Sequence, residues 1–200
     1  MKRCTLIIPD AGPINSLWVA DQLSLLLKLD MKIVVVDAVY DEMTSDESYP
    51  KDKAVKEFID ANQPPFVVET TDIGTAERAK RARGEKTKKN AGELAIMDFM
   101  SSENGLRRYL TPNDPVLLLF EDSDWHIYRK PPNLHVLSTV GMLRGLEQVG
   151  VINSAKAIIY EMTHPSKPDR RLSDACVLTD LPNGTDLPAT IGSEWEPPTP

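Results

Sequence analysis

The 200-residue chain has little cysteine and no long apolar run, and each shortage excludes a class of protein. Its two cysteines, Cys4 and Cys176, lie far apart and fit neither a disulfide framework nor a zinc-binding spacing. No apolar run approaches the roughly 20 residues that a membrane-spanning helix requires. The chain also enters its first apolar run too quickly for a secretory signal peptide. We therefore expect a cytoplasmic protein.

Basic residues are in the minority, since the formal net charge is −7 and the isoelectric point is near 5.0. A dedicated nucleic-acid-binding domain is usually basic overall, so the charge argues against a purely passive binding role. It argues less against an enzyme, because an acidic metal site contributes negative charge and basic groups can still gather locally.

The length suits one sizeable α/β domain with its own core. After Leu181 the composition shifts to proline, glycine, threonine and acidic residues. The sequence therefore predicts one domain over residues 1–181 and a proline-rich, disordered tail over residues 182–200.

Acidic residues recur where apolar, strand-like runs end. Asp10 follows the run that ends at Pro9, and Glu42 lies in a helical pattern just after the run 33–36. Glu93 opens a further helical pattern, and Asp122 and Asp124 follow the run 116–120. Parallel strands would bring such ends to one edge of an open α/β sheet, where ligand sites are found.

Several carboxylates gathered in one place raise one another's pKa unless a cation neutralises them. Hard oxygen ligands in that number suit Mg²⁺ or Mn²⁺. The pattern predicts a magnesium site. Taken singly, each acid has an ordinary alternative, for example Asp10 as a helix N-cap or Glu93 as a partner of the helix dipole.

The remaining elements follow from the apolar periodicity. We expect a helix from Pro13 to about Leu29, a polar loop over 44–52 and a helix from about Lys53 to Ala61. Short strands are expected at 66–68 and 134–137. A helix from Thr139 with a glycine cap at Gly150, and another capped by Ser154, would complete the domain.

The stretch 78–89 is the basic part of the chain. It is open to two interpretations, a solvated loop or a lip that contacts the phosphates of a nucleic acid. Its place just before Glu93 favours the second. The candidate RNA-binding residues are Arg78, Arg81, Arg83, Lys86, Lys88 and Lys89. For hydroxyl residues such as Thr139, an ordinary loop role is preferred to a phosphate contact.

Taken together, the four acidic segments resemble those of the PIN-domain nucleases. The likeness rests on Asp-Ala-Gly-Pro-Ile at 10–14, Val-Tyr-Asp-Glu-Met at 39–43, Gly-Glu-Leu-Ala-Ile at 92–96 and the segment 117–125. It covers roughly residues 5–165 and is greatest to the VapC-like toxins of bacterial toxin–antitoxin pairs.

The resemblance implies a three-layer α/β/α fold around a central parallel sheet of four to five strands, and a Mg²⁺- or Mn²⁺-dependent endoribonuclease. Asp10, Glu42, Glu93 and Asp122 match the four acidic positions, with Asp124 as an auxiliary metal ligand. It also implies a homodimer that acts on RNA and is inhibited by a small antitoxin protein.

The chain departs from the family pattern at two places. Gly12 stands where a hydroxyl residue is common, and Ala95 stands where some relatives carry a second acid. These departures bear on the metal geometry and the toxin role more than on the fold. A degenerate PIN-like domain that binds RNA or protein without cutting stays an alternative, although the filling of all four acidic positions argues against it. A receiver-like phosphotransfer domain is disfavoured, because no lysine follows the run 134–137.

Overall fold

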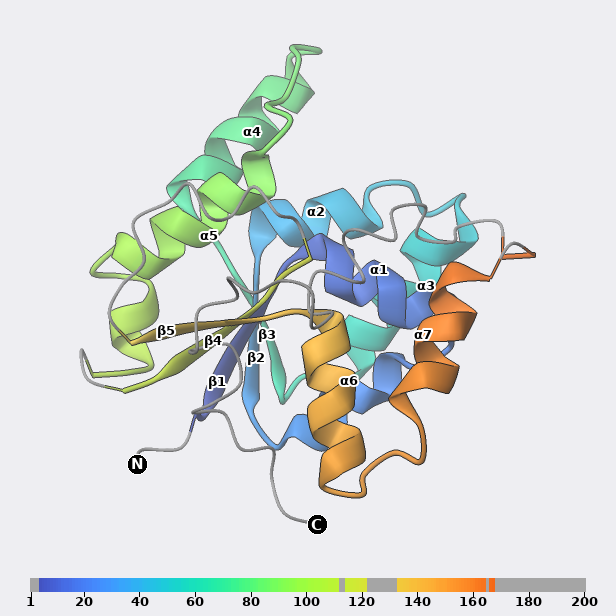
Figure 1. Cartoon of the computed structure of the whole chain (residues 1–200). Helices are drawn as coiled ribbons and strands as arrows, with labels where there is room; N and C mark the ends of the chain where they lie inside the picture. Colours follow the sequence, from blue (N-terminus) through green and yellow to red (C-terminus); the bar gives the residue numbers. More distant parts are fainter. Residues whose placement is uncertain (1–3, 112–113, 122–132, 165, 168–200) are drawn as a thin grey trace.

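The apolar runs of the sequence form five parallel strands in the order β3-β2-β1-β4-β5 (Figure 1). The computed structural model describes residues 4–111, 114–121, 133–164 and 166–167. The strands are β1 (Leu6–Pro9), β2 (Lys32–Val36), β3 (Phe66–Glu69), β4 (Val116–Leu119) and β5 (Leu134–Leu137). In the centre of the sheet, Ile7 pairs with Ile33 on one side and with Leu117 on the other. Every residue of β1 and β4 is buried, as expected for strands that are covered on both faces.

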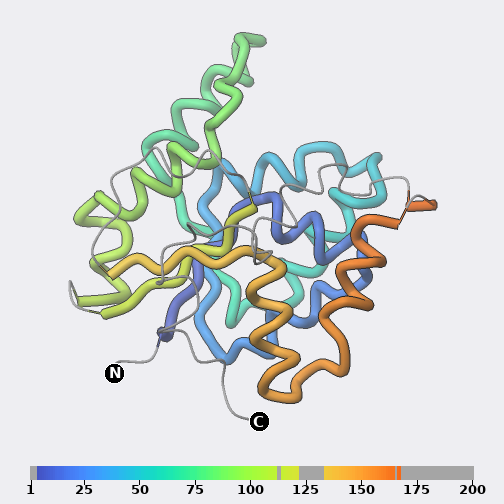
Figure 2. Tube along the Cα trace, in the orientation of Figure 1, coloured from blue at the N-terminus to red at the C-terminus, as the bar shows by residue number. Residues whose placement is uncertain are grey.

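Helices flank the sheet on both sides and complete the predicted three-layer α/β/α fold (Figures 1 and 2). They are α1 (Ala11–Val19), η1 (Leu23–Leu29), α2 (Asp37–Thr44), α3 (Pro50–Ala61), α4 (Asp72–Ala82), α5 (Ala91–Ser101), η2 (Leu106–Arg108), α6 (Thr139–Gln148) and α7 (Ala155–Thr163). Of the helices described, none is long and apolar enough to cross a membrane.

Local side-chain chemistry explains where several helices begin. The Ser138 hydroxyl accepts a hydrogen bond from the Gly141 N–H at the start of α6, and Ser154 does the same for Ala157 at the start of α7. The predicted Ser154 cap is thereby confirmed. Gly150 follows α6 with a φ of +76°, which is the left-handed conformation expected of a C-terminal glycine.

The first helix is shorter than predicted. We expected it to run from Pro13 to about Leu29, but α1 ends at Val19 and a 3-10 helix, η1, follows. Between them Asp21 adopts a φ of 56°, and this left-handed conformation, which aspartate tolerates better than most residues, ends the helical hydrogen bonding. Apolar spacing continues through the break, so periodicity alone did not reveal it.

Two further boundaries also needed correction. The polar loop ends before Pro50, because proline suits the first position of a helix and starts α3 there. The basic stretch is only partly a loop, since residues 78–82 lie in the last turns of α4. The predicted tail, residues 182–200, falls outside the part of the chain that the structure describes.

The far end of α4 and residues 83–90 form an arm that projects from the body of the molecule, and α5 returns beside α4 and packs on the body (Figures 1 and 2). The base of the arm is packed closely. Asp98 of α5 accepts hydrogen bonds from the backbone N–H groups of Asp72 and Ile73 at 2.8 and 3.3 Å. Gly74 of α4 approaches Asp37 so closely that an added Cβ would lie 2.1 Å from Oδ1 of that carboxylate.

Gly74→Ala should therefore destabilise the fold. No side chain fits between α4 and Asp37, so the two must move apart, and we expect a loss of about 1–3 kcal/mol in the free energy of unfolding. Chemical denaturation measures it. Thr75→Ala, at an exposed position of the same helix, is the matched control. Equal stability of the two variants would contradict the close packing of α4 on Asp37.

Candidate metal and nucleic-acid site

The carboxyl ends of the strands carry acidic and hydroxyl side chains to one edge of the sheet. Asp10 follows β1, and its backbone N–H donates a 2.9 Å hydrogen bond to the carbonyl of Leu119 at the end of β4. Glu121 follows β4 by two residues, and Thr139 follows β5 by two. Pairing of the strands thus places side chains that are distant in sequence side by side.

Two of the predicted site residues, Asp10 and Glu42, lie beside Gly92 at this edge, and Glu93 follows Gly92 in the chain. A Cβ added to Gly92 would lie 3.4 Å from Oε2 of Glu42 and 3.6 Å from Oδ1 of Asp10. The absence of a side chain at Gly92 thus lets the first turn of α5 approach both carboxylates. Glu93, the next residue, is half-buried and close enough to influence the charge of Asp10.

The pKa of Asp10 is raised from 3.8 to about 7, chiefly by burial and to a smaller extent by the negative charges of Glu42 and Glu93. The backbone N–H groups of Ala11 and Gly12 oppose the rise only in part. Asp10 occupies the N-cap position of α1, yet its side chain makes no capping hydrogen bond of good geometry. The simple N-cap interpretation therefore does not account for this residue.

The chemistry of these donors fits a hard divalent cation, because all are carboxylate oxygens and their mutual repulsion would be relieved by positive charge. Within the described ranges, no three acidic, histidine or cysteine side chains lie close enough together to hold a metal ion. Asp122 and Asp124, the other two predicted ligands, lie outside those ranges.

Glu121 is a buried carboxylate that sequence reasoning passed over in favour of Asp122. Its side chain is 3% exposed and accepts hydrogen bonds from the hydroxyl of Ser16, at 2.9 Å, and from that of Thr139. Ser16 lies on α1 and Thr139 begins α6. Glu121 therefore ties the end of β4 to two helices, and the Thr139 hydroxyl is occupied by this carboxylate. The only sequence signal was an acid directly after an apolar run.

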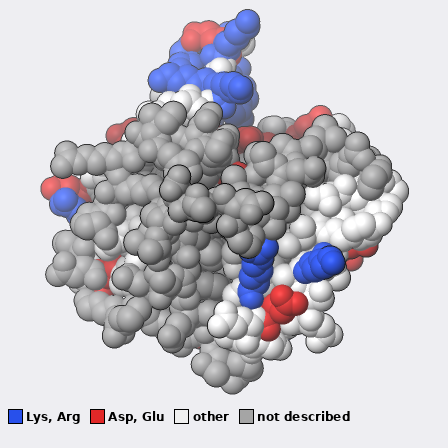
Figure 3. Space-filling view, viewed as in Figure 1, with Lys and Arg blue, Asp and Glu red and all other residues white. Residues whose placement is uncertain are grey.

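The basic residues of the arm are used in two ways. Arg78 and Arg81 pair with Asp41 of α2, and Arg83 pairs with Glu85. By contrast, three exposed lysines make no ion pair with any residue of the described ranges. They are Lys86, Lys88 and Lys89. In Figure 3, Lys and Arg side chains gather over the projecting end of the arm.

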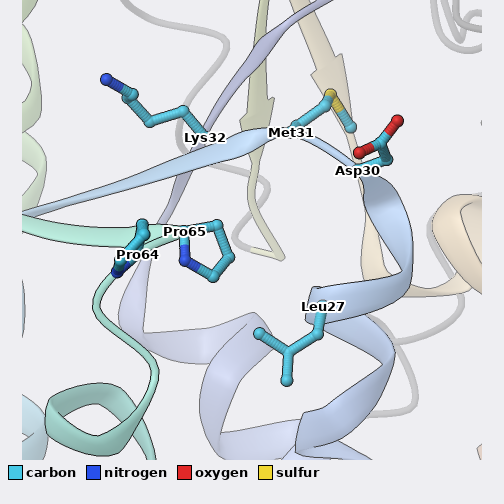
Figure 4. A pocket seen from close by; sticks show the side chains of 6 residues that line it. All are labelled: Leu27, Asp30, Met31, Lys32, Pro64 and Pro65. Carbon is cyan, nitrogen blue, oxygen red and sulfur yellow. The ribbon is translucent and has the colours of Figure 1, made fainter.

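A hollow of about 340 Å³ lies elsewhere, at the amino ends of β2 and β3 (Figure 4). Leu27, Met31, Pro64 and Pro65 line it, and Asp30 and Lys32 lie at its rim. It faces away from the edge that carries Asp10. Its lining is mainly apolar and lacks converging acids, so it is no part of the acidic site.

Comparison with known proteins supports the same family as the sequence motifs. Residues 6–88 match the family model DUF3368, which is described as a PIN domain. No curated protein and no solved structure matches the chain. The matched residues run from β1 to the loop that follows α4, and include Asp10, Glu42 and most of the basic stretch. Since PIN domains are in general nucleases that use divalent metal ions, the match supports a hydrolase that acts on nucleic acid.

Asp10→Asn should stabilise the metal-free protein at neutral pH. Because the folded-state pKa is raised to about 7, the folded protein holds this proton more tightly than the unfolded chain between about pH 4 and 7. Stability due to Asp10 therefore falls as the pH rises through that window. The variant should gain about 1–3 kcal/mol above pH 7, discounted for partial exposure, and almost nothing at pH 4.

Thermal unfolding in a chelating buffer at several pH values measures the difference. Asp30→Asn, which removes an exposed charge at the other edge of the sheet, is the matched control and should leave the unfolding temperature at pH 7.5 unchanged. A variant that is no more stable than the parent at any pH would show that burial and the neighbouring charges do not disfavour the ionised form of Asp10.

Thr139→Val should destabilise the fold whether or not nucleic acid is present. The substitution keeps the shape of the side chain but removes a hydroxyl that bonds a buried carboxylate, which costs about 1.5–3 kcal/mol. Urea denaturation measures the change. Thr163→Val removes a hydroxyl that bonds only carbonyls of its own helix and should cost far less. Similar losses in both variants would contradict the anchoring role of Glu121.

Proposed function

We propose that this protein is a metal-dependent endoribonuclease whose site lies at the carboxyl edge of the sheet, around Asp10. The observation that carries the proposal is the raised pKa of Asp10 beside Glu42 and Glu93, at an edge reached by a chain segment that matches a PIN-domain model. A purely structural acid has little reason to be kept among like charges, whereas a ligand for a cation does.

Each acid has a separate part in the proposed site. Asp10 and Asp122 would bind a Mg²⁺ or Mn²⁺ ion directly or through water, with Asp124 as an auxiliary ligand. Glu42 and Glu93 would complete the ligand shell or orient the attacking water. The bound ion lowers the pKa of its water and neutralises charge on the phosphate in the transition state.

The basic arm would guide the backbone of the substrate. Arg81, Arg83, Lys86, Lys88 and Lys89 are all exposed, and they precede Gly92 in the chain. Cationic side chains in such a series bind phosphates without reading sequence. The N-terminus of α5 beside Gly92 adds backbone N–H groups that favour an anion.

The finer biological role rests on the resemblance of the motifs to those of VapC-like toxins. It supports a cytoplasmic toxin that acts on RNA as a homodimer and is held inactive by a small antitoxin protein. The antitoxin would act by covering the same acidic edge.

One observation favours a second candidate, a PIN-like domain that binds RNA or protein without cutting. As noted above, the described residues do not bring three ligands together. Mg²⁺ binding without cleavage would identify that case, and the arm would then bind RNA with unchanged affinity in a chelating buffer.

The test is cleavage of a labelled pool of structured and single-stranded RNA by the purified full-length chain, with Mg²⁺, Mn²⁺ or a chelator. We expect cleavage that requires metal and falls about 100-fold or more in Asp10→Asn and Glu42→Gln, because each removes a charge from the site. Glu57→Gln, at an exposed position on α3, is the control and should cleave normally.

Absence of cleavage by folded, antitoxin-free protein, with RNA binding retained, would favour the second candidate. Cleavage that persists in Asp10→Asn would place the site elsewhere.

A further inference from the structure

Arg78 differs from the other cationic residues of the arm, because carboxylates of one helix surround its guanidinium group. Nε lies 2.7 Å from Oδ2 of Asp41 and Nη2 lies 3.1 Å from Oδ1 of the same residue. The third nitrogen, Nη1, lies 3.2 Å from Oδ2 of Asp37. The Nε–Nη2 edge of the guanidinium is thus occupied by one carboxylate and Nη1 lies against another, so Arg78 is less available to a phosphate than an arginine without such partners, although its side chain is 41% exposed.

Asp37 depends on this arginine for neutralisation. It begins α2 and is 0% exposed. Its Oδ1 accepts hydrogen bonds from the Ala38 N–H and from the N–H and hydroxyl of Thr71. Oδ2 has no hydrogen-bond partner in the described structure and faces only the guanidinium of Arg78. A buried carboxylate that loses its only counter-charge is strongly destabilised.

The same contacts connect the arm to the acidic site. Asp41 immediately precedes Glu42 on α2, and Val39 of α2 would contact a Cβ on Gly92 at 3.1 Å. Glu77, one residue before Arg78, accepts a 2.9 Å hydrogen bond from the backbone N–H of Lys88 in the returning chain. Helices α2, α4 and α5 are thus joined around Arg78.

We propose that Arg78 is a positioning residue that holds the arm and the first turn of α5 against α2, and does not contact nucleic acid. The inference rests on the proposed nuclease function for its catalytic consequence, but not for its structural one. The proposal separates Arg78, which positions the arm, from the exposed residues of the basic stretch, which would contact phosphates.

The test compares Arg78→Ala and Asp41→Asn with Arg83→Ala and with the control Arg107→Ala. Arg107 is an exposed arginine on η2 whose ion-pair partner, Glu103, is also exposed. Binding of a single-stranded RNA is measured against salt concentration in a chelating buffer, and cleavage is measured with Mg²⁺. Amide hydrogen exchange of residues 86–95 reports the docking of the arm without any nucleic acid.

Arg83→Ala should lower the slope of log affinity against log salt by about 0.7, the value for one phosphate contact to a single strand. Arg78→Ala should leave that slope unchanged, lower kcat about 10- to 100-fold through misplacement of the site, and speed exchange at residues 86–95. Arg107→Ala should match the parent chain in every measurement.

Asp41→Asn gives the sharpest contrast, because the two interpretations predict opposite signs. If Arg78 positions the arm, this variant reproduces the lower kcat and the faster amide exchange of Arg78→Ala. If Arg78 is a phosphate contact, losing its acidic partner frees it and tightens RNA binding. Because Asp41 also pairs with Arg81, the comparison is made with Arg81→Ala in both chains. Tighter binding by Asp41→Asn in that background, or a lower salt slope in Arg78→Ala, would overturn the proposal.

If the parent chain neither cuts nor binds RNA, the proposed nuclease function fails. In that case the amide exchange data still decide whether Arg78 positions the arm. Normal exchange at residues 86–95 in both Arg78→Ala and Asp41→Asn would reject it, and faster exchange would support it.

Discussion

Parallel pairing of all five strands is the constraint on which the rest of the structure depends. It directs every strand end to the same edge of the sheet, so the polar residues that follow β1, β2, β4 and β5 gather there. Because the strand residues are mostly apolar and buried, the charged side chains lie just beyond the strand ends. The gathering of carboxylates is therefore a consequence of topology. Each carboxylate then requires a counter-charge, hydrogen-bond donors or a raised pKa.

The acids of this edge differ in what surrounds them. Asp37 faces the guanidinium of Arg78, and Glu121 accepts bonds from two buried hydroxyls. Each thereby connects helices and strands into a rigid frame. For Asp10, by contrast, burial raises the pKa and the charges of its neighbours Glu42 and Glu93 add to the rise. This contrast separates the acids that connect helices and strands from Asp10, and it is the physical basis of the proposed nuclease site.

Much of the fold follows from local signals in the sequence. Apolar runs predicted all five strands, and the Ser154 cap and Gly150 marked helix ends. The acids near the strand ends indicated the edge at which Asp10 and Glu42 lie close together. Partnerships between distant residues could not be predicted. Glu121 meets Ser16 across 105 positions, and Arg78 meets Asp41 across 37. Such pairs depend on packing angles that neither periodicity nor spacing encodes, which is why Arg78 could not be told from its basic neighbours.

The most direct test of this account is a carbon-13 NMR titration of the Asp10 carboxyl group, assigned by comparison with Asp10→Asn, first in a chelating buffer and then with saturating Mg²⁺. The account predicts a pKa of about 7 without the cation. It also predicts that Mg²⁺ lowers this value by about 1–3 pH units, as expected when an opposite charge comes within a few ångströms. A pKa near 3.8 in the chelating buffer, or one that Mg²⁺ leaves unchanged, would contradict a cation-binding site at this edge.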